Sequence, residues 1–198
     1  VISLASKYNY KLKIGYGNLG TNASEETARI ARYKFLHNLR NLHHANSIVT
    51  AHHQDDVIET AIINLLRGTS RRGLSSLKSS PGITRPLLNW TKEDIYKYAK
   101  EHKLVWVEDE SNNDQTYLRN WVRANIMPVL KPKSEARERF IQIINTSAKQ
   151  NIVIDKYIAK LSQNIINTKN NRDKFILLPN AVACEVVSKL LTDYRVND

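Results

Sequence analysis

Apolar positions change their spacing several times along this chain, and each change predicts a new element of secondary structure. Residues 1–7 are apolar at positions 1, 2, 4 and 5, as at the end of a helix, whereas residues 10–14 alternate like a half-buried strand. From Ser24, an N-cap residue followed by two acids, small or apolar residues recur at helical spacing to about Leu42. The first forty residues therefore predict a helix, a strand and a second helix.

The middle of the chain continues this alternation. The apolar run 47–51 predicts a buried strand, and residues 57–66 predict a helix that Gly68 ends. Residues 69–82 are rich in Ser, Gly and Arg and predict a flexible loop.

A further helix is predicted from Thr91, where Asp94 completes a capping box, to about His102. Residues 105–107 predict a short strand. Helices alternating with strands are typical of an α/β domain with a largely parallel sheet.

Strand patterns become sparse beyond Tyr117, and prolines at 128 and 132 interrupt the helical pattern. The segments predicted here are helices over 117–130, 134–167 and 179–194, with a polar loop at 167–171. We therefore place a boundary near residue 131, between an α/β domain (1–130) and a small all-α domain (131–198).

The charge of the chain indicates the kind of partner. Thirty Lys and Arg against 19 Asp and Glu give a net charge of +11, which favours a polyanion, most commonly a nucleic acid. A basic surface without a partner is the alternative.

Three features bear on location. No run approaches the roughly 18 apolar residues of a membrane span, and the first residues lack the layout of a signal peptide. The single Cys184 excludes a disulfide framework within one chain and fits a reducing cytoplasm. We expect a cytoplasmic protein, and the missing initiator Met predicts that this chain is the interior of a longer one.

The densest group of reactive side chains is the run from His52 to Thr60, where a predicted strand passes into a helix. Ligands of open α/β sheets bind at the carboxyl ends of strands, so this position suits a site. Glu59 shares a helical face with Asp55 or Asp56, and such carboxylates can bind a metal ion or a substrate ammonium group.

Two other interpretations of this run remain open. The acids can simply cap a helix N-terminus, which explains Asp55 and Asp56 but not Glu59 with two histidines. A zinc site also uses His and Asp, although the adjacent His52 and His53 diverge on a strand. We assign no metal ligands.

Residues 15–20 match the pattern G-x-G-x-x-G, but the match predicts only a loop. A dinucleotide fingerprint needs the helix to open within the glycines and an acid about 20 residues later. Here the helix begins only near Ser24.

Arginines supply candidate anion ligands. Arg119 and Arg123 are four residues apart and Arg29 and Arg32 three apart, so each pair shares a helical face suited to phosphate. Solvated helix faces are the alternative. The basic loop that carries Arg67, Arg71 and Arg72 suits contact with a phosphate backbone.

In this order the segments resemble the tRNA(Ile)-lysidine synthetase family of N-type ATP pyrophosphatases. The resemblance is carried by Ser24-Glu25-Glu26, Ala28-Arg29, Ala31-Arg32-Tyr33, His52-His53-Gln54-Asp55-Asp56, Glu59-Thr60, Leu65-Leu66-Arg67-Gly68, Arg72-Gly73-Leu74, Arg85-Pro86-Leu87-Leu88, Glu108-Asp109, Ser111-Asn112, Asp114, Tyr117-Leu118-Arg119-Asn120 and Arg123. Each piece is weak alone, but the colinear set over 24–130 is specific. Residues 175–191 are similar to the family's second, helical domain.

The resemblance implies a ligase. Such an enzyme adenylates C2 of the wobble cytidine of a tRNA(Ile) with a CAU anticodon, and the ε-amino group of free L-lysine then displaces AMP. It releases pyrophosphate and is assisted by Mg²⁺. The implied fold is a nucleotide-binding-like parallel-sheet domain, incomplete at its N-terminus, and the implied partners are ATP, lysine and tRNA. The oligomeric state stays open, a homodimer being one option.

The same resemblance suggests roles for single residues. Asp56 and Glu59 are expected to hold the lysine ammonium, with His52, Asp55, Arg119 and Arg123 in the catalytic set. Arg29, Arg32, His53 and Arg119 are expected to bind ATP phosphates. Arg67, Arg71, Arg72 and Asn120 are expected to contact tRNA.

The family's phosphate loop, Ser-Gly-Gly-x-Asp-Ser, does not occur in these 198 residues. The family places it before the point where this chain starts. Two alternatives to the ligase therefore stay open: a non-catalytic tRNA-binding protein, and a tRNA-thiolating enzyme of the same superfamily. Against thiolation, relatives with that chemistry often use added cysteines, whereas Cys184 is the only one here.

Overall fold

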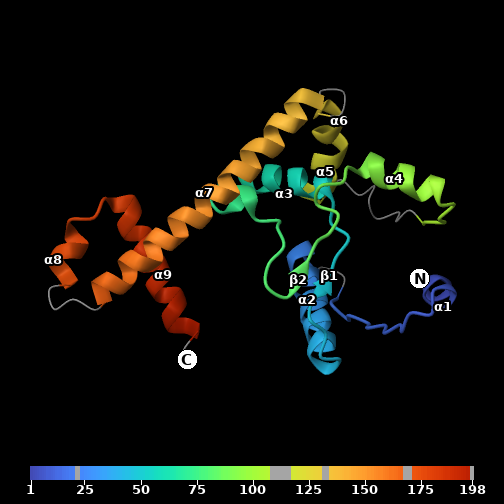
Figure 1. Ribbon diagram of the computed structural model, residues 1–198, viewed down its shortest axis with the longest axis horizontal. Helices are drawn as coiled ribbons and strands as arrows, with labels where there is room; N and C mark the ends of the chain where they lie inside the picture. The colour runs from blue at the N-terminus through green and yellow to red at the C-terminus, as the bar shows by residue number, and fades with distance from the viewer. Residues whose placement is uncertain (21–22, 108–116, 131–133, 167–170, 197–198) are drawn as a thin grey trace. The chain divides into compact units, whose positions relative to one another are not determined.

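A computed structural model describes residues 1–20, 23–107, 117–130, 134–166 and 171–196 (Figure 1). The chain forms two compact units, one of residues 1–56 with 78–120 and the other of residues 57–77 with 121–198. These units interleave along the sequence, and a domain boundary near residue 131 stays a prediction.

The first unit contains a small parallel sheet. Strand β1 (Ile48–Val49) pairs with β2 (Ile83–Thr84), with Ile48 opposite Ile83. The hydroxyls of Ser47 and Thr84 extend the pairing at 2.7 Å. The parallel pairing agrees with the predicted α/β class, although β1 is shorter than predicted and β2 lies outside every predicted strand.

The strands predicted at 10–14 and 105–107 are wrong. Neither segment pairs with a strand among the described residues, and Val105 and Val107 are 81% and 93% exposed. Alternating apolar residues favour an extended backbone, but a strand also needs a neighbour that satisfies its N–H and C=O groups.

Local signals predicted the helices of the first unit well. The Oγ of Ser24 accepts a hydrogen bond from the Thr27 N–H at 3.1 Å and begins α2 (Glu25–Leu42). Thr91 and Asp94 form the predicted capping box of α4 (Lys92–Glu101). Helix α1 spans Ile2–Lys7.

Helix α3 (Gln54–Leu66) begins three residues earlier than its apolar pattern predicted. Its end at Gly68 is confirmed, because that residue has φ +67°, a left-handed conformation that favours glycine. The predicted flexible loop after it contains a short 3-10 helix, η1 (Gly73–Ser75).

The segment 117–130 forms two helices, α5 (Leu118–Asn125) and α6 (Met127–Leu130), rather than the one predicted. Pro128 explains the break, because its ring nitrogen has no hydrogen to donate to a preceding turn.

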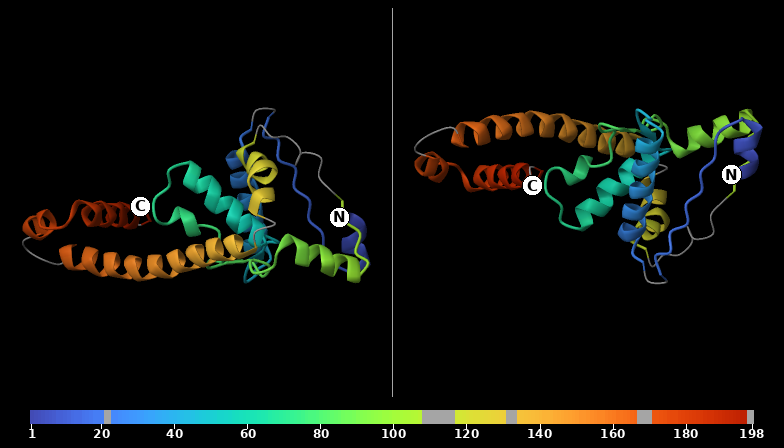
Figure 2. Two further views of the ribbon diagram at one scale, coloured as in Figure 1. Left: turned by 90° about the horizontal axis from the view of Figure 1, so that it is seen from above. Right: turned by 90° about the horizontal axis from the view of Figure 1, so that it is seen from below.

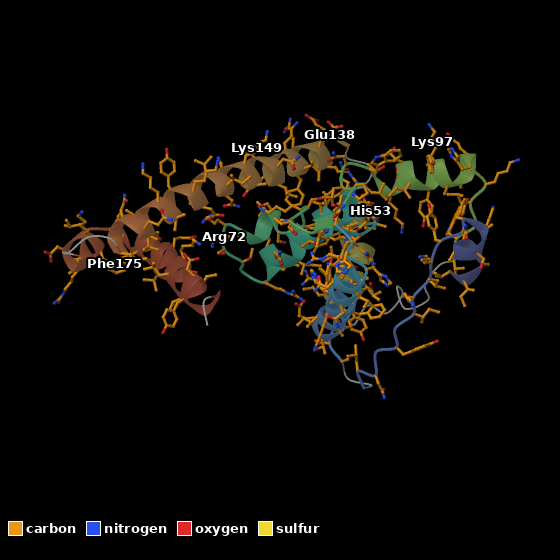
Figure 3. All side chains as sticks on the ribbon, turned by 60° about the horizontal axis from the view of Figure 1, so that its bottom comes forward. His53, Arg72, Lys97, Glu138, Lys149 and Phe175 are labelled. Carbon is orange, nitrogen blue, oxygen red and sulfur yellow. The ribbon has the colours of Figure 1, made fainter. Side chains whose placement is uncertain are left out.

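The second unit contains an antiparallel helical pair. Both views of Figure 2 show α9 (Asn180–Val196) running back along α7 (Ser134–Ile166). The core between them is formed by Ile158, Ile165 and Val186, with Phe175 packed against it (Figure 3). Helix α8 (Asn171–Ile176) begins at the last residue of the predicted polar loop. That the helices after residue 131 form a domain of their own stays a prediction.

No helix in the described ranges combines the length and the apolar character that crossing a membrane requires.

Candidate functional site

The run after β1 is shaped by the start of α3. The backbone N–H of His53 donates to Oδ2 of Asp56 at 2.9 Å, and the His53 Nε2 lies 3.5 Å from the same oxygen. Asp56 thus caps the helix that it belongs to, as one of the alternative interpretations expected. The capping turn also fixes the direction of this carboxylate.

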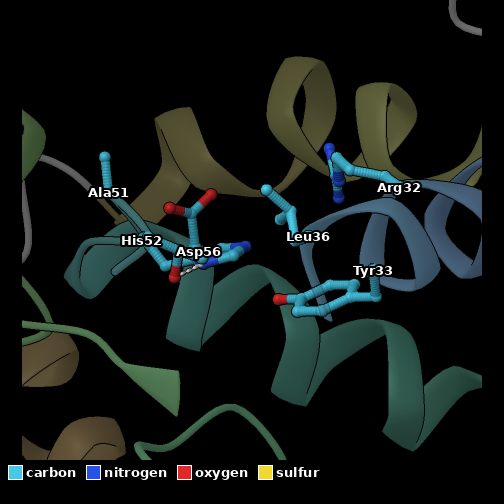
Figure 4. Close-up of a pocket in the computed structure, with 7 residues that line it drawn as sticks. Arg32, Tyr33, Leu36, Ala51, His52 and Asp56 are labelled. Atoms are coloured by element: carbon cyan, nitrogen blue, oxygen red, sulfur yellow. Dashed lines mark hydrogen bonds between the residues drawn. The ribbon is translucent and has the colours of Figure 1, made fainter. Parts of the chain in front are cut away.

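A hollow of about 280 Å³ lies beside this turn, in the first unit (Figure 4). It is lined by Arg32, Tyr33 and Leu36 of α2, by Thr50, Ala51 and His52 after β1, and by Asp56. We call it the α2–β1 pocket. It joins a guanidinium group to a carboxylate across a space large enough for a small polar molecule.

The surroundings of His52 in this pocket favour its neutral ring. Its Nδ1 shares a hydrogen bond with the Thr50 hydroxyl at 2.8 Å. Burial lowers the pKa of His52, and although Asp56 acts in the opposite sense, the charges of Arg85, Arg32 and Arg119 lower it further. A neutral imidazole at pH 7 can accept a proton from a bound group.

The four arginines predicted to bind phosphate occupy different surroundings. Arg32 lines the pocket, whereas Arg29 is half-exposed and pairs with Glu26 at 3.3 Å. Arg119 lies 3.3 Å from Glu25. Arg123, in the second unit, donates to Glu59.

Glu59 is 4% exposed, and its Oε1 accepts from the Nε of Arg123 at 2.8 Å. Asp55, also on α3, is 5% exposed. Their burial is unusual for carboxylates, which are rarely buried unless they are paired. The charge of Glu59 is therefore at least partly balanced by Arg123.

Two of the arginines predicted to contact tRNA are engaged within the second unit. Arg71 donates to Glu185 at 2.9 Å and to Asp155 at 2.6 Å, and Arg72 donates to Asp155 at 2.7 Å. These pairs lower the pKa of Asp155 and of Glu185 through hydrogen bonds from the guanidinium groups.

Asn151 completes this cluster, because its amide donates to the Arg71 carbonyl at 3.0 Å and its Oδ1 accepts from the Arg71 side chain at 2.8 Å. We call these five residues the arginine clamp; Figure 3 labels Arg72 within it. The clamp fastens the segment after α3 to α7 and α9. Of the other predicted tRNA contacts, Arg67 is exposed and Asn120 is buried.

Sequence reasoning missed Tyr33, Arg85 and the acidic half of the clamp. Asp155 and Glu185 are more than 80 residues from their arginines, so no local spacing could have paired them. Tyr33 and Arg85 stood within the family-like segments without a role.

Groups of three or more His, Cys, Asp or Glu side chains arranged to hold a metal ion do not occur in the part of the chain that the structure describes. The zinc interpretation gains no support from these residues.

Comparison with known proteins identifies the family of this chain. Residues 1–130 match the model of the PP-loop domain. The chain is 39% identical over 158 residues to a tRNA(Ile)-lysidine synthase of Wigglesworthia glossinidia brevipalpis, which covers 76% of this chain and 38% of that protein. It is 37% identical to a tRNA(Ile)-lysidine synthase of Proteus mirabilis, covering 75% of this chain and 35% of the relative.

A bifunctional TilS/HprT protein of Listeria monocytogenes is 36% identical over 162 residues, or 78% of this chain and 24% of that protein. The chain thus spans roughly a quarter to two fifths of the length of these relatives.

The match over residues 1–130 identifies a PP-loop domain of the N-type ATP pyrophosphatase class, and the parallel strand pair is consistent with it. Within that class, the chain belongs to the tRNA(Ile)-lysidine synthase family.

Proposed function

We propose that the full-length protein is a tRNA(Ile)-lysidine synthase. It uses ATP to adenylate C2 of the wobble cytidine of a tRNA(Ile) with a CAU anticodon and then joins free L-lysine to that carbon. The observation that carries the proposal is the α2–β1 pocket, which presents the Asp56 carboxylate and the Arg32 guanidinium to one space.

The pocket chemistry suits an amine nucleophile. Asp56 is 8% exposed and is oriented by His53, so it offers a fixed negative charge to a lysine ammonium group. Holding the amine next to the activated base supplies proximity, which a bimolecular attack by an amine needs most.

Proton transfer completes the substitution. As the nitrogen of lysine forms its bond to C2, the bond from C2 to the oxygen of the adenylyl group breaks, and AMP leaves with the electron pair. An ammonium nitrogen has no free electron pair, so it must lose one proton before it attacks, and the neutral His52 is the proposed acceptor of that proton. The second proton leaves the nitrogen to solvent after the bond to C2 has formed.

The ion pair between Glu59 and Arg123 suggests separate roles for Asp56 and Glu59, which the sequence had grouped as ammonium ligands. We propose Asp56 as the main ammonium ligand and Glu59 as the residue that holds Arg123. ATP brings Mg²⁺ with its phosphates in this proposal, and no metal ligand is assigned to this chain.

The decisive experiment measures ATP-dependent transfer of radiolabelled L-lysine to a tRNA(Ile) transcript by the full-length wild-type protein. Transfer that requires ATP and a cytidine at the wobble position supports the synthase. Binding of the transcript without transfer would instead indicate a non-catalytic tRNA-binding protein, an outcome that the net charge of +11 makes worth testing. Incorporation of labelled sulfur would indicate thiolation.

A further inference from the structure

Arg85 is a buried arginine that has no acidic partner among the residues that the structure describes. Its side chain is 8% exposed, and no carboxylate lies within ion-pair distance of it in the described ranges. The guanidinium donates to the carbonyl of Lys78 and, at 3.3 Å, to the hydroxyl oxygen of Tyr33. Its Nε is buried without a hydrogen-bond partner among the described residues. A buried charge is costly unless it is balanced, so an unbalanced one points to an absent anion.

Tyr33 connects this charge to the α2–β1 pocket. Its ring lines the pocket, and Figure 4 shows its hydroxyl directed from α2 toward the side where His52 and Asp56 lie. The bond from Arg85 has only one possible direction, because a guanidinium group donates and never accepts. The Tyr33 oxygen is therefore the acceptor, and its own proton remains to be donated elsewhere.

That proton has no acceptor among the described residues. The contacts of Tyr33 are the bond from Arg85, the ring of His37 and the guanidinium groups of Arg29 and Arg32 over its ring, at 5.4 and 5.9 Å. The charged groups that contact Tyr33 are the guanidinium groups of Arg85, Arg29 and Arg32. These positive charges favour a ligand whose acceptor oxygen is negatively charged.

We propose that Tyr33 is a ligand-binding residue of the α2–β1 pocket that donates its hydroxyl proton to an oxyanion of a bound substrate, and that Arg85 is the positioning residue that sets the direction of this donation. Arg32 supplies the second contact to the same oxyanion. This assignment rests on the proposed function and deepens it.

Two sources of this oxyanion are compatible with the chemistry, namely the α-carboxylate of lysine and a phosphate of ATP. The pocket has Asp56 at its other side, so an amino acid would match it with an ammonium group toward Asp56 and a carboxylate toward Tyr33. A phosphate would meet the same hydroxyl and guanidinium group.

The test uses the full-length protein and Tyr33→Phe, which removes one oxygen and keeps the ring. Loss of a hydrogen bond to a charged group weakens binding about tenfold or more. Calorimetry with L-lysine and with ATP, each titrated separately, distinguishes the sources. An approximately tenfold weaker lysine affinity, with cadaverine (lysine without its carboxylate) unaffected, assigns the carboxylate. A weaker ATP affinity with unchanged lysine affinity assigns the phosphate.

Arg85→Lys tests the positioning role through a double-mutant comparison. If Arg85 acts through the Tyr33 hydroxyl, Arg85→Lys weakens the affected ligand in the otherwise wild-type protein but not in the Tyr33→Phe background. A merely structural role would give the same loss in both backgrounds, and this result overturns the assignment of Arg85.

Unchanged affinity of Tyr33→Phe for both ligands overturns the assignment of Tyr33. These binding measurements remain informative if lysine transfer by the wild type fails, so failure of the further inference and failure of the proposed function are separate results.

Discussion

Arg123 donates to Glu59 across 2.8 Å, and the two side chains differ sharply in exposure: the guanidinium group is 36% exposed and the carboxylate 5%. The pair therefore has one buried and one solvated end. Because the guanidinium group is partly solvated, the ion pair itself adds little to the free energy of unfolding. Removing the arginine costs more, because the buried Glu59 carboxylate then loses this donor.

The burial of Glu59 predicts that removing Arg123 costs more than removing an arginine from an exposed ion pair. Arg123→Gln should lower the free energy of unfolding by about 1–3 kcal/mol, because the Glu59 carboxylate loses a donor inside the protein. Urea denaturation followed by circular dichroism measures the change. Arg139→Gln is the matched control, since Arg139 pairs with Glu135 on an exposed face and should cost under about 1 kcal/mol. Equal costs for both variants would contradict the assignment.

The arginine clamp predicts a loss of stability in acid. The folded pKa values of Asp155 and Glu185 lie below their ordinary values of 3.8 and 4.5, so their contribution is complete above those values. It is lost as pH falls through the lowered pKa values. Stability measured between pH 6 and about 2 should therefore fall less steeply for Glu185→Gln than for wild type. The exposed Glu138→Gln is the control, and an identical slope in Glu185→Gln would refute the clamp.

His52 should titrate below its ordinary pKa of 6.5, chiefly because it is buried. Since its charged form is disfavoured in the folded state, the protein should lose stability as pH falls through 6.5 toward the lowered pKa. NMR of the ring carbons measures the pKa directly. Asp56→Asn should lower it further and Arg32→Gln should raise it, because Asp56 raises and Arg32 lowers the pKa in the wild type. Shifts of opposite sign would be incompatible with this electrostatic arrangement.

Replacing Gly68 should lower the stability of the protein only through the conformation of the backbone. Its φ is +67°, and a Cβ at this position would meet no atom within 4 Å. Gly68→Ala should thus destabilise the protein by about 1 kcal/mol through backbone strain alone. Thermal unfolding measures this cost, and Gly68→Asn, which tolerates this conformation better, should recover part of it. A neutral Gly68→Ala would show that the end of α3 can adopt another backbone.

Local chemistry made some of these features predictable. Ser24 and Thr91 lie within three residues of the groups that they cap, so the sequence alone located the beginnings of α2 and α4. Residues 10–14 lack such a local determinant, since a strand depends on a neighbour that the pattern of one segment does not specify.

The residues of the site were also predictable only where they lie close together in the sequence. His52 and Asp56 follow β1 directly, and their presence in one pocket agrees with the strand-to-helix pattern. Arg71 and Arg72 looked like phosphate ligands because their partners Asp155 and Glu185 lie in distant segments. Long-range pairing of this kind is decided by packing, which spacing along the sequence does not encode.

The central claim is that the Asp56 carboxylate receives the lysine ammonium group, and lysine transfer by Asp56→Asn full-length protein tests it most directly. The substitution keeps the shape of the side chain and removes its charge. The account predicts that this variant binds the tRNA(Ile) transcript like wild type but transfers labelled lysine at least about tenfold more slowly, whereas Asp173→Asn, at an exposed acid on α8, transfers normally. Transfer by Asp56→Asn at the wild-type rate and with the wild-type KM for lysine would contradict it.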